Sequence, residues 1–153
     1  MTDTSANNTQ KSYSSSVTLL ITGENLDPNV VTDKLSLTAN QSWKKGEKRI
    51  FSSGREHIYP WGGWKRFARE QEASFFLEEQ LEAWLNVLSP KATEIEFIKS
   101  LGASVTLDCY ISVSNAATTQ MKVEILTKLG NLGIAVALNI FGDAEKNSPL
   151  SNP

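Results

Sequence analysis

Apolar and polar residues alternate in three segments of the chain, as they do in half-buried β-strands. The first segment, residues 16–23, places on one face Val17, Leu19 and Ile21. The second segment, residues 103–113, places on one face Val105, Leu107, Cys109, Ile111 and Val113. The run IAVALNIF, residues 134–141, predicts the last strand.

One helix is predicted directly after the first of these strands, and another between the last two. Asp27 followed by Pro28 is typical of a helix start, because Asp caps free amides and Pro suits the first helical position. This helix is expected to bury Val30, Val31 and Leu35. Residues 118–130 predict another helix, which Thr118 or Thr119 caps and Gly130 ends.

The clearest helical pattern follows Ser74, a capping residue, and stops at Pro90. Its apolar residues recur at the helical spacing: Leu77, Leu81, Trp84, Leu85 and Leu88. Its opposite face carries Glu78, Glu79 and Glu82. A short helix closed by Gly102 comes next.

Residues 49–68 lie between the helix that starts at Pro28 and the helix that follows Ser74. They predict one or two strands, with SSG and PWGGW as turns. Gly62 and Gly63 are expected to make a tight reversal beside Lys65 and Arg66, because glycine adopts positive φ at little cost. We expect one tryptophan of this stretch to be buried and the other to be at least partly exposed.

The predicted order β-α-β(β)-α-α-β-α-β indicates an α+β two-layer sandwich, a mixed sheet with helices mainly on one face. The strand–helix–strand unit at each end of the chain predicts a parallel pair of strands. A single domain is expected over residues 16–142, between disordered tails at residues 1–15 and 143–153. The predicted core comprises Leu81, Trp84, Leu85, Leu107, Ile111, Val136, Leu138 and Ile140.

The composition of the chain indicates its cellular compartment and shows how its charges are distributed. The chain has 153 residues, no long apolar run and one cysteine, so we expect a cytoplasmic bacterial protein that does not cross a membrane. Residues 44–69 carry eight cations and two acids, whereas residues 70–96 carry seven acids and one cation. Such asymmetry is typical of a protein that uses its field on a partner, although interleaved surface charges explain it equally well.

Signals for catalysis are poor. The sequence has no phosphate-binding loop of the GxxxxGK[ST] type and no GxGxxG motif. His57 is the only histidine and Cys109 the only cysteine, and the strand pattern turns Cys109 inward. The sequence therefore predicts a protein that is not an enzyme, with no catalytic residues, no metal site and no cofactor.

Two surfaces compete as the contact with a partner. The basic and aromatic surface comprises Arg55, His57, Tyr59, Trp61, Trp64, Lys65, Arg66 and Arg69, and the acidic surface comprises Glu78, Glu79 and Glu82. Trp, Tyr and Arg dominate the binding energy of protein interfaces. Aromatics interleaved with cations also suit single-stranded nucleic acid, or the aromatics simply cover a core. The isoelectric point of about 5.5 and the lack of a known motif weigh against nucleic acid.

Several motifs resemble the bacterial family called domain of unknown function 4279, over roughly residues 16–142. They are a Gly-x-x-Leu-Asp-Pro turn, a Val-Thr-x-x-Leu-x-Leu helix, a later glycine and a tryptophan strand, here Gly23, Leu26, Asp27, Pro28, Val31, Thr32, Leu35, Leu37, Gly46, and Trp61 or Trp64. The resemblance implies no enzyme chemistry. Some members look like immunity proteins that neutralise a toxin encoded by a neighbouring gene. The leading hypothesis is thus a non-enzymatic protein that blocks a cognate toxin by steric occlusion. The alternative is a ligand-binding or single-stranded-nucleic-acid-binding module that uses residues 55–69.

Overall fold

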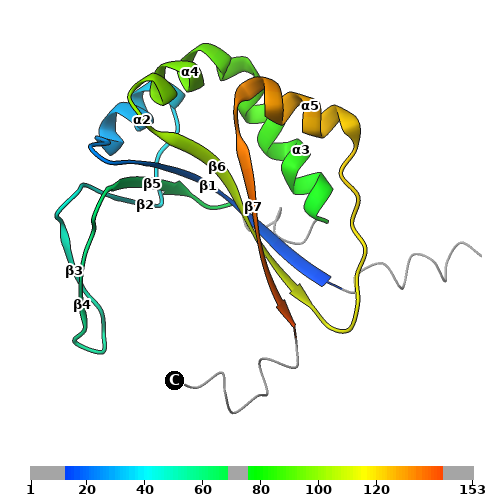
Figure 1. Ribbon diagram of the computed structural model, residues 1–153, viewed down its shortest axis with the longest axis horizontal. Coiled ribbons are helices and arrows are strands. Elements are labelled where there is room, and N and C mark those ends of the chain that lie inside the picture. The colour runs from blue at the N-terminus through cyan, green and yellow to red at the C-terminus, as the bar shows by residue number, and fades with distance from the viewer. Residues whose placement is uncertain (1–12, 69–75, 143–153) are drawn as a thin grey trace, which may run out of the picture.

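The computed structural model describes residues 13–68 and 76–142. Its main sheet has five strands in the order β2-β5-β1-β6-β7, and its helices lie on one side of that sheet (Figure 1). The strands are β1 (Tyr13–Gly23), β2 (Gln41–Trp43), β5 (Gly62–Arg66), β6 (Ser104–Val113) and β7 (Ala135–Gly142). The helices are α2 (Pro28–Leu35), α3 (Leu77–Leu88), α4 (Ala92–Ser100) and α5 (Val123–Leu132). A second sheet pairs β3 (Lys48–Ile50) with β4 (Glu56–Ile58). The predicted α+β two-layer arrangement is confirmed.

β1 is the central strand and is antiparallel to both of its neighbours, β5 and β6. β7 is parallel to β6 and follows it through α5, which confirms the predicted unit at this end of the chain. β2 is antiparallel to β5, so it runs in the same direction as β1 with β5 between the two. The second strand of the first unit was predicted within residues 49–68, and the strand of that segment in the main sheet, β5, is antiparallel to β1. The parallel pair predicted at the N-terminal end of the chain is therefore wrong.

Asp27 caps α2 as predicted, because its Oδ1 accepts a hydrogen bond from Asn29 N at 3.0 Å. α5 differs from the prediction. It begins after Lys122 rather than at Thr118 or Thr119, and Gly130 lies inside it. The residue that ends this helix is Gly133, whose φ of 68° is left-handed.

Other boundaries also shift. β1 begins at Tyr13, three residues before the expected start of the domain at residue 16. Pro90 lies in a 3-10 turn, Ser89–Lys91, that connects α3 directly to α4. Ser74, expected to cap α3, lies outside the described residues.

The prediction of PWGGW as a tight turn is wrong. Gly62 and Gly63 are strand residues of β5, and neither has positive φ. Both glycines are needed for close approach instead. A Cβ at Gly62 would lie 2.3 Å from the backbone oxygen of Leu26, and one at Gly63 would lie 2.1 Å from the ring of Trp43.

Five of the eight predicted core residues are buried, namely Leu81, Trp84, Leu85, Leu107 and Ile111. Val136 is partly buried against them. Leu138 and Ile140 are 48% and 60% exposed, so their assignment to the core is wrong. β7 is an edge strand whose C-terminal half runs beyond the helices, which leaves its inner face uncovered (Figure 1).

α3 also completes the hydrogen bonding of β1. The pairing of β1 with β5 starts at Leu19, so the preceding residues have an edge that β5 does not reach. Gln80 Oε1 accepts from Val17 N at 3.0 Å, and Gln80 Nε2 donates to Ser15 O at 2.8 Å. Trp84 Nε1 donates to Val17 O at 3.0 Å. Two side chains of α3 therefore take the place of a neighbouring strand.

Candidate functional site: the β3–β4 arm

Residues 44–61 leave the main sheet as a projecting hairpin, which we call the arm. It lies on the side of the sheet opposite the helices (Figure 1). Its turn is closed by a hydrogen bond from Phe51 N to Arg55 O at 2.9 Å, and Gly54 supplies the positive φ of 85° that the turn requires. No residue of the arm belongs to the hydrophobic core. All six strand residues of β3 and β4 are exposed.

The register of the hairpin gives the arm two chemically different faces. Lys48 pairs with Ile58, Arg49 with His57, and Ile50 with Glu56. Directly opposite residues of an antiparallel pair share a face. One face, the aliphatic face, therefore comprises Lys48, Ile50, Glu56 and Ile58; the other, the ring face, comprises Arg49, Phe51, Arg55, His57 and Tyr59.

The aliphatic face is apolar at its centre and charged at its edge. Ile50 and Ile58 are 65% and 60% exposed. Lys48 Nζ lies 3.2 Å from the carboxylate of Glu56. Two isoleucines on a surface hairpin add nothing to the core of this chain, so a partner that buries them would gain hydrophobic contact at this face.

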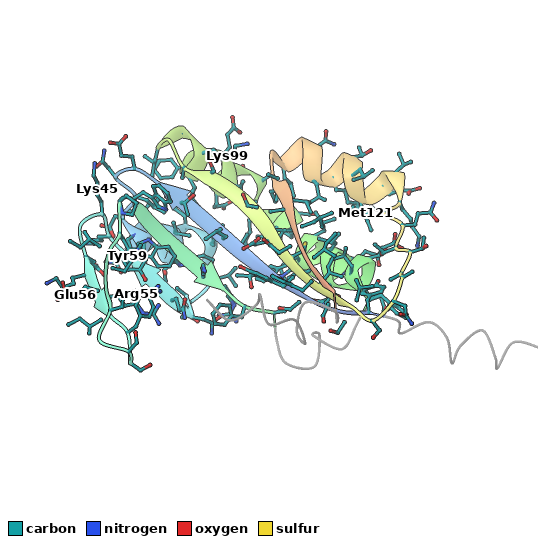
Figure 2. All side chains as sticks on the ribbon, turned by 60° about the horizontal axis from the view of Figure 1, so that its bottom comes forward. Lys45, Arg55, Glu56, Tyr59, Lys99 and Met121 are labelled. Atoms are coloured by element: carbon teal, nitrogen blue, oxygen red, sulfur yellow. The ribbon has the colours of Figure 1, made fainter. Side chains whose placement is uncertain are left out.

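The ring face forms a continuous series of contacts that ends on the main sheet. Tyr59 stacks on Trp43 with ring centroids 4.7 Å apart, and His57 meets Tyr59 edge-on at 4.7 Å. Arg49 Nη1 donates to Tyr59 Oη at 3.5 Å, and its guanidinium lies 5.1 Å from the centre of the Phe51 ring. A hairpin of two three-residue strands is only marginally stable alone. These side-chain contacts therefore hold the arm in place. Figure 2 shows Tyr59, Arg55 and Glu56 in this part of the molecule.

Trp43 anchors this series on the sheet. It lies opposite Gly63 in the pairing of β2 with β5, and its ring occupies the space that a side chain there would need. Lys65 Nζ lies 5.7 Å from the ring centre. Trp43 is only 9% exposed, and its Nε1 has no hydrogen-bond partner among the described residues. Its role is to position the arm.

The structure separates the predicted basic and aromatic residues. Trp64 is fully buried, and its Nε1 donates to Thr32 Oγ1 at 3.0 Å. Its assignment to a contact surface is therefore wrong, because β5 turns its side chain toward α2. The side chain of Arg66 is held by the fold itself, since its Nη1 donates to Thr38 O at 2.8 Å. Arg69 lies outside the described residues.

Trp61 is 50% exposed, which confirms the expectation of one buried and one exposed tryptophan. It lines a pocket of about 540 Å³ where the base of the arm meets the ends of β1 and β6. The other residues around this pocket are Thr22, Gly23, Glu24, Pro60, Gly102 and Ser104.

The predicted acidic residues lie on α3, away from the arm (Figure 1). Glu78 accepts a hydrogen bond from Lys122 N at 3.0 Å at the start of α5, and its carboxylate lies 3.5 Å from Lys122 Nζ. Glu79 accepts from Phe76 N at 3.3 Å at the start of α3. Glu82 lines a pocket of about 420 Å³ between α3 and α5. Two of these three carboxylates thus hold helix starts in place.

Two neighbouring residues of β6, Cys109 and Tyr110, have raised pKa values. Burial raises the pKa of Cys109 to about 12, so its thiol is protonated and unreactive at neutral pH. A hydrogen bond to Asp108 raises the pKa of Tyr110. Among residues 13–68 and 76–142, no group of three His, Cys, Asp or Glu side chains could hold a metal ion.

Sequence reasoning missed the residues that shape the arm: Trp43, Arg49, Ile50, Phe51 and Ile58. The signal was present, because the SSG turn, residues 52–54, separates KRIF from REHIY. Counting outward from that turn gives the observed register.

No helix in the described ranges is both long enough and apolar enough to cross a membrane. The chain matches no curated protein and no solved structure. A model of the family described as Domain of unknown function (DUF4279) matches residues 11–142, and the chain therefore belongs to this family.

Proposed function

We propose that this protein is a non-enzymatic, immunity-type inhibitor that binds a cognate bacterial toxin in the cytoplasm and blocks it by steric occlusion. The observation that carries the proposal is the arm. Its strand residues are all exposed, it contributes nothing to the core, and it is nevertheless fixed to the sheet by the stack of Tyr59 on Trp43. A fixed, exposed hairpin loses little conformational freedom on binding.

Charge favours the arm over α3 as the contact surface. The arm carries five cations and two acids. On α3, by contrast, Glu78 and Glu79 already accept hydrogen bonds within the fold. The proposed toxin therefore presents an acidic surface to the arm, with Ile50 and Ile58 as the apolar anchors.

Single-stranded nucleic acid has less support as the partner. Stacking on bases needs exposed ring faces. Trp64 is fully buried and Trp43 is 9% exposed, and the ring of Trp43 is already stacked on Tyr59. Of the tryptophans Trp43, Trp61 and Trp64, only Trp61 is half exposed, and one indole is a poor platform for several successive bases.

The test is co-expression with the product of the neighbouring gene, read out as cell survival and as affinity of the purified pair. Ile50→Ser with Ile58→Ser removes the apolar anchors of the arm. We expect this double variant to fold and to bind at least about tenfold more weakly, because buried anchors dominate interface energy.

The matched control is Val123→Ser with Leu126→Ser, which removes two exposed apolar side chains from α5, away from the arm. This control should bind and protect normally. Equal losses in both double variants, or no toxicity in any neighbouring gene product, would refute the proposal.

A further inference from the structure

We propose that Arg49 and Arg55, held against the ring of Phe51, form a carboxylate-binding site that takes Asp or Glu side chains from an acidic segment of a protein partner. The identity of the partner rests on the proposed function. The chemistry of the site does not, because it follows from the ring face of the arm.

Both guanidinium groups lie over the same ring. The distance to the centre of Phe51 is 5.1 Å for Arg49 and 5.0 Å for Arg55. This is the range in which a cation is attracted to an aromatic face, so the ring orients both groups. Phe51 is half-buried, whereas Arg49 and Arg55 are exposed. Both charges therefore lie within 5.1 Å of the centre of one ring and remain open to solvent.

Neither arginine has a carboxylate partner within the described residues. The ion pairs at the arm are made by its lysines instead: Lys44 with Asp27, Lys45 with Glu24, and Lys48 with Glu56. An anion that binds beside this ring is attracted by both positive charges. The guanidinium fork binds a carboxylate through two parallel hydrogen bonds.

The rest of the arm favours an acidic protein segment as the source of that anion. The reverse face of the same hairpin exposes Ile50 and Ile58, which suits a partner with apolar surface beside its acids. The nearby rings of Tyr59 and Trp43 stack on each other rather than lying open to bases. We therefore propose protein carboxylates as the ligand, and the experiment below tests phosphate as the alternative.

The experiment follows backbone amide and arginine side-chain signals of the ¹⁵N-labelled protein while a hexaglutamate peptide is added. We expect saturable shifts at Arg49, Phe51 and Arg55 that weaken as salt is raised. Hexaglutamine, which has the same length and no charge, should produce none.

Two double variants separate a defined site from general attraction. Arg49→Gln with Arg55→Gln and Lys44→Gln with Lys45→Gln each remove two positive charges from the arm. The arginine variant should weaken hexaglutamate binding at least about fivefold more than the lysine variant, since only the arginines form charge-assisted fork contacts. Equal weakening, or shifts spread over all cations, would overturn the site.

Inorganic phosphate and a single-stranded oligonucleotide serve as competing probes. If either displaces hexaglutamate at lower concentration than hexaglutamate itself binds, the commitment to carboxylates is wrong. The outcome is independent of the toxin assay. Hexaglutamate binding without toxin neutralisation would leave the site standing and remove the proposed function. Neutralisation that survives the arginine variant would support the function and reject the site as its contact.

Discussion

Cys109 illustrates at the residue scale how burial controls chemistry. Its side chain is fully buried on the inner face of β6, and burial raises the pKa of its thiol from 9.0 to about 12. Between these values the unfolded chain loses the thiol proton and the native protein keeps it. The native state then binds more protons, so the free energy of unfolding falls as pH rises.

We accordingly predict that the contribution of Cys109 to stability is fully present below pH 9 and is lost between pH 9 and 12, by at most about 1.4 kcal/mol per pH unit. Urea unfolding at pH 8, 9.5 and 11 measures this slope. Cys109→Ala retains Tyr110 and the lysines, so the difference in slope between the two proteins isolates the thiol. Identical slopes would show that the thiol titrates normally.

At the scale of the element, α3 and β1 depend on one buried amide. Gln80 is 1% exposed and holds both Val17 N and Ser15 O. Gln80→Leu fills the same space but leaves both backbone groups without these partners. We predict a loss of about 2–4 kcal/mol in the free energy of unfolding, because each unsatisfied buried group costs about 1–3 kcal/mol.

Chemical denaturation measures this loss, and Glu82→Gln, an exposed change two residues along α3, is the control. Hydrogen exchange adds a local readout, since the Val17 amide should lose protection more than that of Leu19. A stability of Gln80→Leu within about 0.5 kcal/mol of the wild type, the range of ordinary surface changes, would contradict the role given to this side chain.

The elements that the sequence predicts correctly are those that bury one continuous face. β1, β6 and α3 each carry a periodic apolar set, and a neighbouring layer covers it. The same pattern in β7 marks the inner face but contains no information on whether a helix reaches it. Leu138 and Ile140 are exposed for that reason. Gly62 and Gly63 show a second limit of prediction from sequence. The sequence does not distinguish a glycine that close packing requires from a glycine that a turn requires.

The candidate site was predicted in part. Arg55, His57 and Tyr59 do lie together on the ring face of the arm. Trp64 was misplaced because the strand pairing of Gly62–Arg66, and not its composition, turns that indole inward. The contact of Phe51 with two arginines depends on a hairpin register that composition alone does not contain.

At the scale of the whole molecule, charge and apolar contact are divided between parts of the arm with different kinetic roles. Cations at its base and edge, such as Lys44 and Lys48, are exposed and would act over distance on the acidic partner that we propose. Ile50 and Ile58 act only after contact. Rim charges mainly set association rates, whereas buried anchors set dissociation rates.

If the proposed toxin is the partner, Lys44→Gln with Lys48→Gln should lower its association rate several-fold and leave the dissociation rate nearly unchanged. Ile50→Ser should do the reverse. Raising the ionic strength from about 0.05 to 0.5 M should slow association by about tenfold, since steering by exposed charges is screened. Surface plasmon resonance of the purified pair measures both rates. Glu78→Gln with Glu82→Gln is the control on α3, and a larger effect of that variant than of the lysine variant would move the contact from the arm to the acidic helix.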